Sequence, residues 1–579
     1  MSKTSNTFHL GFTMAGAVSA GAYTAGFMDY ILEALDNWES AKKEANPNDV
    51  IPKHNVIIDA LGGASAGGMV SMITTLALYS GNHRPVKEVS KTKTGNILYD
   101  SWVFLDDDDS LYNETKKGRT TFEKMLSTSD LTGDHGAPSL LNSTPIDRIA
   151  ETVFEKIPKD AGTGNFPKYI SENLRLLLTI TSLRPVDYKV KLSKLKSKFL
   201  DSTPGHKISH HDIVAHFKLN YNEPVDKDKF LPFRPIAKSP VEKANKEFLT
   251  NVTKATGAFP IGLAPRYFAD DFSSAYVNHS LSQRKAFDTN MDIELDTTSV
   301  SDFQFTAVDG GAINNEPFDE ILRTLVANHG TANKKNPKYG TVLIDPFPNF
   351  EYEKQPGNTD FKLTSIMDII GYLIPTVLNQ ARNKQTDTYG VGLFKLMAFP
   401  RKLKLGTTQE VDHPPLATGG IGGFGGFLDI DFRIHVFFLG RKNAQNFLRG
   451  VFFMEYDATD KNNLFYGAHP STIAKFGRTV DGKTYMPIIP DVSKLDKDDD
   501  SNPSRYKVQE FPKFKETEFL KLKKPIKKRL KAVLKAELKG KVSNWAMRLV
   551  LGLVISLLSK KMTKWIMDTI MKDFRARGM

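Results

Sequence analysis

Residues 55–68, NVIIDALGGASAGG, join a short apolar run to a glycine-rich turn, and apolar residues at helical spacing follow from Met69. The run at 55–61 predicts a buried strand, and the spacing after the turn predicts a helix. Residues 8–36 repeat this order, with a strand, a glycine-rich turn and a helix. Two such units within 80 residues predict an α/β fold with a mainly parallel central sheet and helices on both faces.

Several later segments carry weaker patterns of the same kind. Residues 85–165 are polar and irregular, and the four aspartates at 106–109 predict an exposed acidic loop because they lack the spacing of a calcium loop. Residues 245–268 predict a helix followed by a turn, and 362–400 predict an apolar helical region that ends near Pro400. Further strands are predicted at 174–183, 303–308 and 341–344.

Length and composition limit the class of protein. The chain has 579 residues, of which 40% are hydrophobic, enough for a large core and two or three domains. It contains no cysteine, which excludes disulfides, thiolate nucleophiles and cysteine-based zinc sites. Residues 8–28 are small and apolar like a signal peptide, but only Lys3 is basic before them, so a strand-to-helix turn is favoured.

The pentapeptide Gly63-Ala64-Ser65-Ala66-Gly67 has the form of a nucleophile elbow, which needs a strand before it and a helix after it. Glycines suit the sharp turn, and the helix N-terminus offers free N–H groups to a developing oxyanion. The competing interpretations are a plain turn or a phosphate-binding loop. A Walker A loop is excluded because no lysine follows the second glycine.

A nucleophilic serine needs a base. Of the 13 histidines none has a persuasive setting: His435 lies in a strand-like run and His9 precedes the first turn. Asp309, followed by Gly310 and Gly311, ends a predicted strand. A carboxylate at the carboxyl end of a parallel strand faces the crevice of an α/β sheet, although an isolated Asp-Gly-Gly is more often a turn.

Ser65 in GASAGG, Asp309 in DGGAINNEP, the first glycine-rich turn and AFPIGLAPRYF together resemble patatin-like phospholipases, over residues 8–350. The resemblance implies a Ser65–Asp309 dyad that hydrolyses lipid acyl esters through an acyl-enzyme. It implies neither cofactor nor metal. The oxyanion donors would be the N–H groups of Gly16, Ala17, Val18 and Ala66.

The chain departs from the family in the oxyanion loop, which usually reads Gly-Gly-Gly-x-Arg-Gly. Here the segment is Gly16-Ala17-Val18-Ser19-Ala20-Gly21, so two glycines and the arginine are replaced. Backbone donors survive such changes unless a positive φ is required. The alternative function is therefore a catalytically weak or inactive membrane-binding adaptor on the same fold.

The resemblance, the composition and the charge together predict four parts in the chain. Residues 1–350 would be the catalytic domain, 351–490 a helical and glycine-rich extension, 491–512 a linker, and 513–579 a basic tail. Within the extension, 418–428 would be either a mobile flap or an ordered surface loop. Candidates to line an acyl groove are Phe259, Phe268 and the helix predicted at 366–377.

The basic charge of the protein is concentrated in the tail. Residues 513–579 carry a net charge of +14, whereas residues 1–512 carry −2. An amphipathic stripe runs from Ile526 to Leu538, and the uncharged apolar run at 549–559 has 11 residues, short of the roughly 20 that a transmembrane helix needs. Flanking Trp545 and Trp565 with lysines favour a helix in the interface of an anionic membrane.

The tail has two competing interpretations: packing against the body or a partner, and nucleic acid binding, which leaves the apolar run without a role. We expect a cytoplasmic protein that associates peripherally with membrane and acts on membrane phospholipid. Homo-oligomers remain open.

Overall fold

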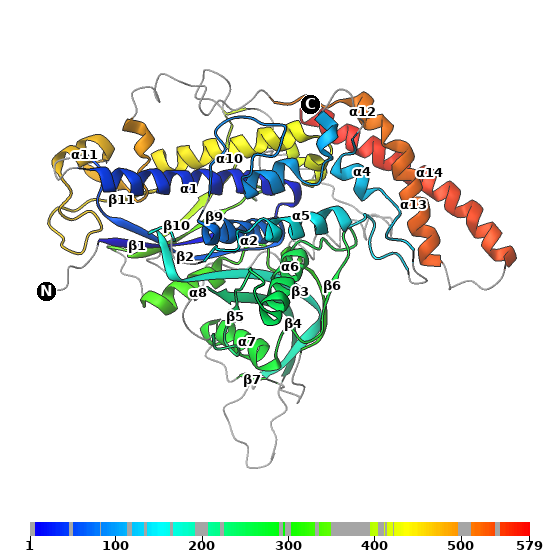
Figure 1. Cartoon of the computed structure of the whole chain (residues 1–579), viewed down its shortest axis with the longest axis horizontal. Coiled ribbons are helices and arrows are strands. Elements are labelled where there is room, and N and C mark those ends of the chain that lie inside the picture. Colours follow the sequence, from blue (N-terminus) through cyan, green and yellow to red (C-terminus); the bar gives the residue numbers. More distant parts are fainter. Residues whose placement is uncertain are drawn as a thin grey trace, which may run out of the picture.

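The structure is a computed structural model and describes residues 6–45, 50–81, 83–112, 118–132, 136–162, 166–190, 206–219, 225–288, 293–295, 303–330, 335–348, 394–402, 410–411, 414–420, 422–495, 511–538 and 545–579. Figure 1 shows a central sheet with helices on both of its faces and a pair of C-terminal helices that extends from one end. The helix predicted at 366–377 and most of the linker at 491–512 lie outside the described residues.

The central sheet has the strand order β10-β9-β1-β2-β3-β4-β5. Outside this order, β7 and β8 pair with β3, and β6 pairs with β8. The first five of these strands are parallel to one another. The prediction of an α/β fold with a mainly parallel sheet is therefore confirmed. The bounds are β1 Thr7–Met14, β2 Asn55–Gly63, β3 Ile170–Val190, β4 His206–Lys218, β5 Leu231–Pro232, β6 Arg266–Phe268, β7 Ile293–Leu295, β8 Phe305–Asp309, β9 Tyr339–Ile344 and β10 Phe394–Ala398.

Helices cover both faces because the central strands are apolar on both sides. On one face, Leu10 and Phe12 of β1 join a core that includes α1, α2 and α10. On the other, Ala60 and Leu343 pack against Ile321 of α8. The bounds of the helices are α1 Gly21–Glu44, α2 Ser65–Ser80, α3 Ile97–Tyr99, α4 Thr121–Met125, α5 Thr144–Glu155, α6 Pro240–Thr256, α7 Ser274–Asp288, α8 Phe318–His329, α10 Ile430–Gly450, α11 Pro470–Phe476, α12 Glu516–Lys521, α13 Lys523–Leu538 and α14 Trp545–Ala576.

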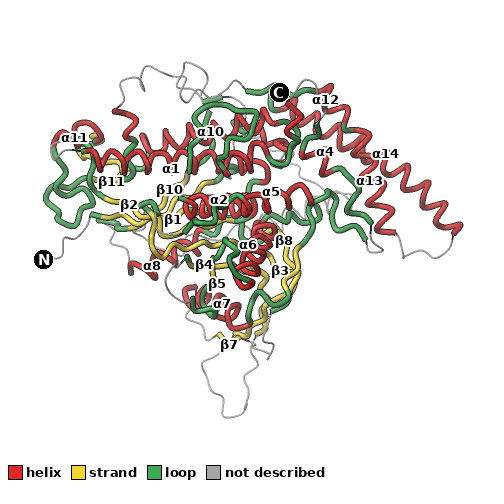
Figure 2. Tube along the Cα trace, in the orientation of Figure 1, coloured by secondary structure: helices red, strands yellow, loops and turns green. Residues whose placement is uncertain are grey.

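The segment that follows the sheet folds back onto the N-terminal units. Figure 2 shows α10 lying along α1, and Arg441 of α10 is buried between Asp29 and Glu33 of α1. A small antiparallel sheet follows α10, made of β11 Phe453–Glu455, β13 Lys483–Pro487 and β12 Arg478–Val480.

Three predictions of local structure were wrong. Residues 394–398, expected to be helical, form the edge strand β10, since their backbone pairs with β9. His435 lies in the helix α10 rather than a strand, because its apolar neighbours face both α1 and the C-terminal helices. Residues 85–165 include short helices, among them α4 and α5.

The acidic run at 106–109 is only partly exposed. Asp107 is buried in an ion pair with Arg433, at 2.6 Å, and Asp106 pairs with Arg148. The loop is therefore anchored to α10 and α5 by charge pairing, which a polar sequence pattern does not reveal.

The C-terminal helix α13 packs against the rest of the protein. In α13, Ile526 and Val533 are buried, and the buried Arg529 pairs with Asp130 and binds the carbonyl of Ser139. Among the described residues, no helix combines the length and hydropathy needed to cross a bilayer.

Candidate active site

Ser65 is the first residue of α2 and follows directly on the turn after β2. Its φ of +52° lies in the left-handed region, where a residue other than glycine is strained. Gly67 is required because a Cβ there would collide with the carbonyl oxygens of Met14 and Ala15. The N–H of Ser65 donates to Thr256 Oγ1 at 3.1 Å, which ties the turn to α6. The turn has the geometry of a nucleophile elbow.

The hydroxyl of Ser65 donates to the carboxylate of Asp309. The distance from Ser65 Oγ to Asp309 Oδ2 is 2.6 Å, and both residues are almost fully buried. The other oxygen, Asp309 Oδ1, accepts the N–H of Gly311 at 2.7 Å. A Cβ at Gly310 would overlap the backbone of Thr179, so the chain after Asp309 lies tightly against β3. The carboxylate is therefore held in one orientation toward the serine.

The strand that carries Asp309 runs in the opposite direction to the one predicted. It ends β8, but β8 is antiparallel to β3 and β6 rather than part of the parallel set. The long β3 continues past the end of β2, and β8 pairs with that extension, with Ile180 opposite Asp309. The side chain thus arrives beside the carboxyl end of β2 from a strand that runs the other way.

Of the predicted oxyanion donors, Gly16 lies against Ser65 but its N–H already has an acceptor. In the described part of the chain, no acceptor takes the N–H of Ala17 or Val18, while the N–H of Gly16 donates to the carbonyl of Asn315 at 3.3 Å. Ala66 lies in the first turn of α2, where helix geometry leaves N–H groups without an intrahelical acceptor. The free donors are therefore Ala17, Val18 and Ala66.

Val18 adopts a conformation that favours glycine. Its φ is +48°, a conformation that glycine adopts at no cost and a β-branched residue adopts with strain. Ala17, by contrast, has an ordinary negative φ of −150°. Of the two lost glycines, only the one at position 18 carries a conformational requirement.

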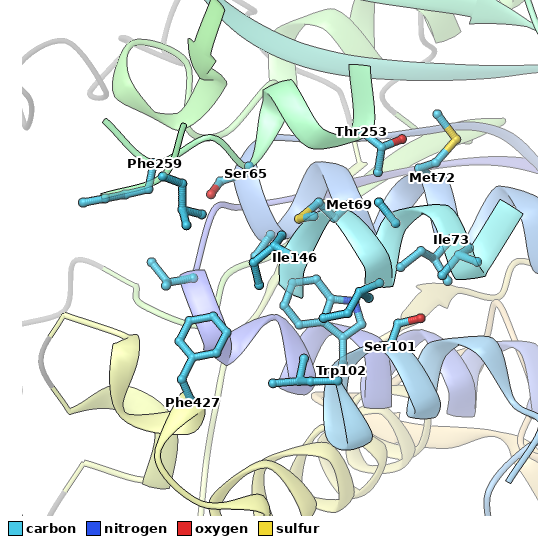
Figure 3. A pocket seen from close by; sticks show the side chains of 18 of the residues that line it. Ser65, Met69, Met72, Ile73, Ser101, Trp102, Ile146, Thr253, Phe259 and Phe427 are labelled. Carbon is cyan, nitrogen blue, oxygen red and sulfur yellow. The ribbon is translucent and has the colours of Figure 1, made fainter. Parts of the chain in front are cut away.

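An apolar pocket opens beside Ser65 (Figure 3). Met69, Met72 and Ile73 of α2 line it beyond the serine, and Phe259 lines it at the serine end. The side chains that line it are Val18, Ser65, Ala66, Met69, Met72, Ile73, Ser101, Trp102, Leu105, Ile146, Ile149, Ala150, Val153, Phe154, Thr253, Phe259, Leu263, Phe424 and Phe427. None of these carries a charge, which suits a hydrocarbon chain.

One wall of the pocket comes from residues 85–165, which were predicted to be irregular. Ile146, Ile149, Ala150 and Val153 of α5 line it. Their i, i+3, i+4, i+7 spacing is the signal that would have identified this helix. Phe259 lines the pocket as expected, but Phe268 does not. It is fully buried against Phe272 and Phe305 in the core.

The glycine-rich segment at 418–428 contributes the opposite wall. Its described residues hold Phe424 and Phe427 against the pocket, and the Phe424 ring meets Phe259 edge to face at 5.4 Å. The carbonyl of Gly423 accepts the N–H of Ser19, so this segment contacts the oxyanion loop directly. Whether it opens as a flap stays a prediction.

The place of the family's arginine is taken by a small buried residue, Ala20, with no exposed surface. A different arginine lies in this region: Arg433 of α10 donates to the carbonyls of Gly426 and Val103 and pairs with Asp107. Its charge is neutralised by Asp107, so it fixes the glycine-rich segment rather than adding net positive charge.

Residues 12–322 match the sequence model of the patatin-like phospholipases, which is more than half of the chain. The chain belongs to the patatin-like phospholipase family. The family model covers both strand–turn–helix units, the elbow and Asp309. It supports lipid acyl hydrolysis as the general activity.

A relative extends the similarity beyond the family region. The uncharacterized protein y4iI of Sinorhizobium fredii, strain NBRC 101917 / NGR234, is 29% identical to this chain over 523 residues. The match covers 84% of this chain and 70% of that protein. The shared sequence therefore includes parts that follow the patatin-like region.

Proposed function

We propose that the protein is a serine lipid acyl hydrolase of the phospholipase A or lysophospholipase type, which cleaves acyl esters of membrane lipids with Ser65 and Asp309. The observation that carries the proposal is the 2.6 Å hydrogen bond between these residues beside an uncharged apolar pocket. The hydrogen bond prepares a nucleophile and its base, and the pocket offers a place for the acyl chain.

The reaction follows from the geometry. Asp309 takes the proton of Ser65 as Oγ attacks the ester carbonyl, and the oxyanion is bound by the N–H groups of Ala17, Val18 and Ala66. Collapse of the tetrahedral intermediate returns the proton to the leaving alcohol and leaves the acyl group on Ser65. Asp309 then takes a proton from water as the water attacks the acyl-enzyme, and returns that proton to Ser65 Oγ as the fatty acid leaves.

The test is release of fatty acid from phospholipid vesicles by the wild type and by two variants. Ser65→Ala should abolish release and Asp309→Asn should lower kcat by about 10³-fold or more, as losses of catalytic residues do in serine hydrolases. Ser80→Ala, at the other end of α2, is the matched control and should keep full activity.

The second candidate function is an inactive adaptor on the same fold, and the altered oxyanion loop favours it. It predicts that wild type and Ser65→Ala are equally inert on every lipid while both still bind vesicles. That result would replace the hydrolase proposal, whereas release that depends on Ser65 removes the adaptor.

The same proposal places the exposed face of α14 on an anionic membrane. This face consists of Val554, Leu557, Leu558, Met562 and Trp565, and Leu557 and Trp565 are 65% and 69% exposed. Ile555, Ser559, Thr563 and Met567, on the opposite side of the helix, are buried. Lys560, Lys561 and Lys564 are exposed beside the apolar stripe, a combination suited to the interface of a negatively charged leaflet.

Point substitutions test this face better than truncation, because Arg529 and Ile526 anchor α13 to the body. The double variant Leu557→Glu, Trp565→Glu should lose most co-sedimentation with vesicles that contain phosphatidylglycerol. Val480→Glu, at another exposed site, should not. Wild-type binding should fall with salt. Unchanged sedimentation of the double variant would exclude α14, and competition by duplex DNA would favour the nucleic acid interpretation.

A further inference from the structure

Away from the pocket, three side chains converge from separate elements: His9 of β1, Asp59 of β2 and His329 at the end of α8. One ligand atom from each lies within 4.8 Å of the others. His9 Nδ1 is 3.0 Å from Asp59 Oδ2, and His329 Nε2 contacts the same oxygen. The imidazole rings lie with centroids 3.9 Å apart.

A backbone irregularity directs Asp59 into this cluster. The pairing of β1 with β2 steps from Leu10–Ile58 to Gly11–Ala60, so Asp59 is an additional residue in β2. The register against β3 also shifts between Ile58 and Ala60. A bulge re-aims a side chain, and here it brings a carboxylate in the centre of a parallel sheet to two histidines.

The three side chains offer ligand atoms to one ion. His9 Nδ1 is buried and lies 3.0 Å from Asp59 Oδ2. When the imidazoles are neutral, two ring nitrogens and a carboxylate oxygen this close together can surround one ion. Imidazole nitrogen and carboxylate oxygen are both common ligands of Zn²⁺ and other divalent transition metals.

The electrostatic setting also suits a cation. His329 is the last residue of α8, where the free carbonyls and the helix dipole are negative. Arg175 of β3 also interacts electrostatically with Asp59.

We propose that His9, Asp59 and His329 bind a divalent transition-metal ion, with Zn²⁺ as the best match, in a structural site that joins β1, β2 and α8. The site lies at the amino ends of β1 and β9, whereas Ser65 follows the carboxyl end of β2. Four steps along β2 separate Asp59 from Gly63, which is about 13 Å. The ion is therefore independent of ester hydrolysis and stabilises the sheet that carries the elbow.

The experiment measures metal binding by the full chain produced without a histidine tag. Isothermal titration with Zn²⁺, and titration with Co²⁺ followed by its visible absorption, report affinity, stoichiometry and ligand geometry. The variants are His329→Gln and Asp59→Asn, and the control is His469→Gln, an exposed histidine elsewhere. His329 is only partly buried, so its substitution should leave the fold intact, which circular dichroism checks.

The wild type should bind one equivalent of Zn²⁺ and melt at a higher temperature with the ion than without it. Loss of an outer-shell partner costs metal sites about 10–100-fold in affinity, so loss of the ligand His329 should weaken binding by at least about 100-fold. His469→Gln should match the wild type. The proposal is overturned if the wild type binds no Zn²⁺, or if the folded His329→Gln and Asp59→Asn variants bind it as tightly as the wild type does.

Discussion

Two residues at the elbow adopt left-handed backbone conformations without being glycine. Ser65 has a φ of +52° and Val18 a φ of +48°. At Ser65 the strain exposes the hydroxyl to Asp309 and the pocket, so a functional reason is visible. At Val18 the same conformation is imposed on a β-branched side chain that lines the pocket.

Substitutions at Val18 separate backbone strain from side-chain loss. Val18→Ala keeps the strain and removes the side chain, whereas Val18→Gly removes both. Because the left-handed region costs an L-residue about 1–2 kcal/mol, Val18→Gly should be more stable than Val18→Ala by about 1 kcal/mol. Urea denaturation of both variants measures the difference. The reverse order would mean that position 18 is not strained in solution.

Asp345 should make the stability of the protein depend on pH. It follows β9, is 3% exposed, and its carboxylate accepts the N–H of Phe347 at 2.8 Å. Burial and then repulsion from Glu316 raise its pKa to about 7. A raised carboxyl pKa means that the folded state holds the proton longer than the unfolded state, so stability falls as pH rises from about 4 to 7.

Asp345→Asn should remove this dependence. An amide keeps an acceptor for Phe347 and carries no charge, so the variant should exceed the wild type in stability at pH 8, by up to about 4 kcal/mol, and match it at pH 4. Thermal midpoints across this range provide the measurement. Asp481→Asn, in the exposed β12–β13 turn, is the control. Parallel curves for wild type and Asp345→Asn would contradict the assignment.

At the scale of elements, the pocket is a space between helices that come from distant parts of the chain. α2 and α5 form its inner walls, and the short helix η7 at Phe424–Phe427 closes the side next to the oxyanion loop. The length of acyl chain that fits is therefore decided by how close α5 lies to α2.

Ile149→Trp should shorten the acyl chain that the pocket accepts. The indole would occupy space beside Ile146 and Val153, and each methylene that is excluded from an apolar site costs about 0.8 kcal/mol. Exclusion of two methylenes should lower kcat/KM for long-chain esters by about tenfold. Butyrate esters serve as the internal control and should be hydrolysed as by the wild type. An equal loss on short and long esters would indicate general damage to the site.

At the scale of the whole molecule, the region after 322 is bound into the patatin-like part. Arg441 of α10 pairs with Asp29 and Glu33 of α1, and all three are buried. Tyr30 of α1 donates to Asp491 at 2.8 Å, which ties the end of the small antiparallel sheet to the same helix.

Arg441→Met should destabilise the whole chain. It leaves two carboxylates buried near each other, and removal of one partner from a buried ion pair costs about 3–5 kcal/mol. The triple variant with Asp29→Asn and Glu33→Gln should recover part of this loss. Urea midpoints report both changes, and Arg401→Met, which breaks an exposed pair with Glu410, should shift the midpoint little. A single variant as stable as the wild type would show that α10 and α1 are joined by apolar contacts alone.

Local sequence determined the two strand–turn–helix units and the elbow. These features depend on neighbours along the chain: a strand, glycines where a Cβ would collide, and a helix that begins at the serine. The amphipathic stripe of α13 was predictable for the same reason. Short-range sterics and periodicity are properties of the sequence itself.

Only the tertiary structure decided which distant residues meet. The antiparallel approach of β8 to Ser65, the α5 wall and the β10 edge strand all depend on long-range pairing. The convergence of His9, Asp59 and His329 depends on a bulge in β2 and on the place where α8 ends. A pattern of residue types records which side chains prefer burial. An apolar side chain could be buried against many different surfaces. Packing of the whole chain decides which surface it contacts, because that depends on how the complete sheet is assembled.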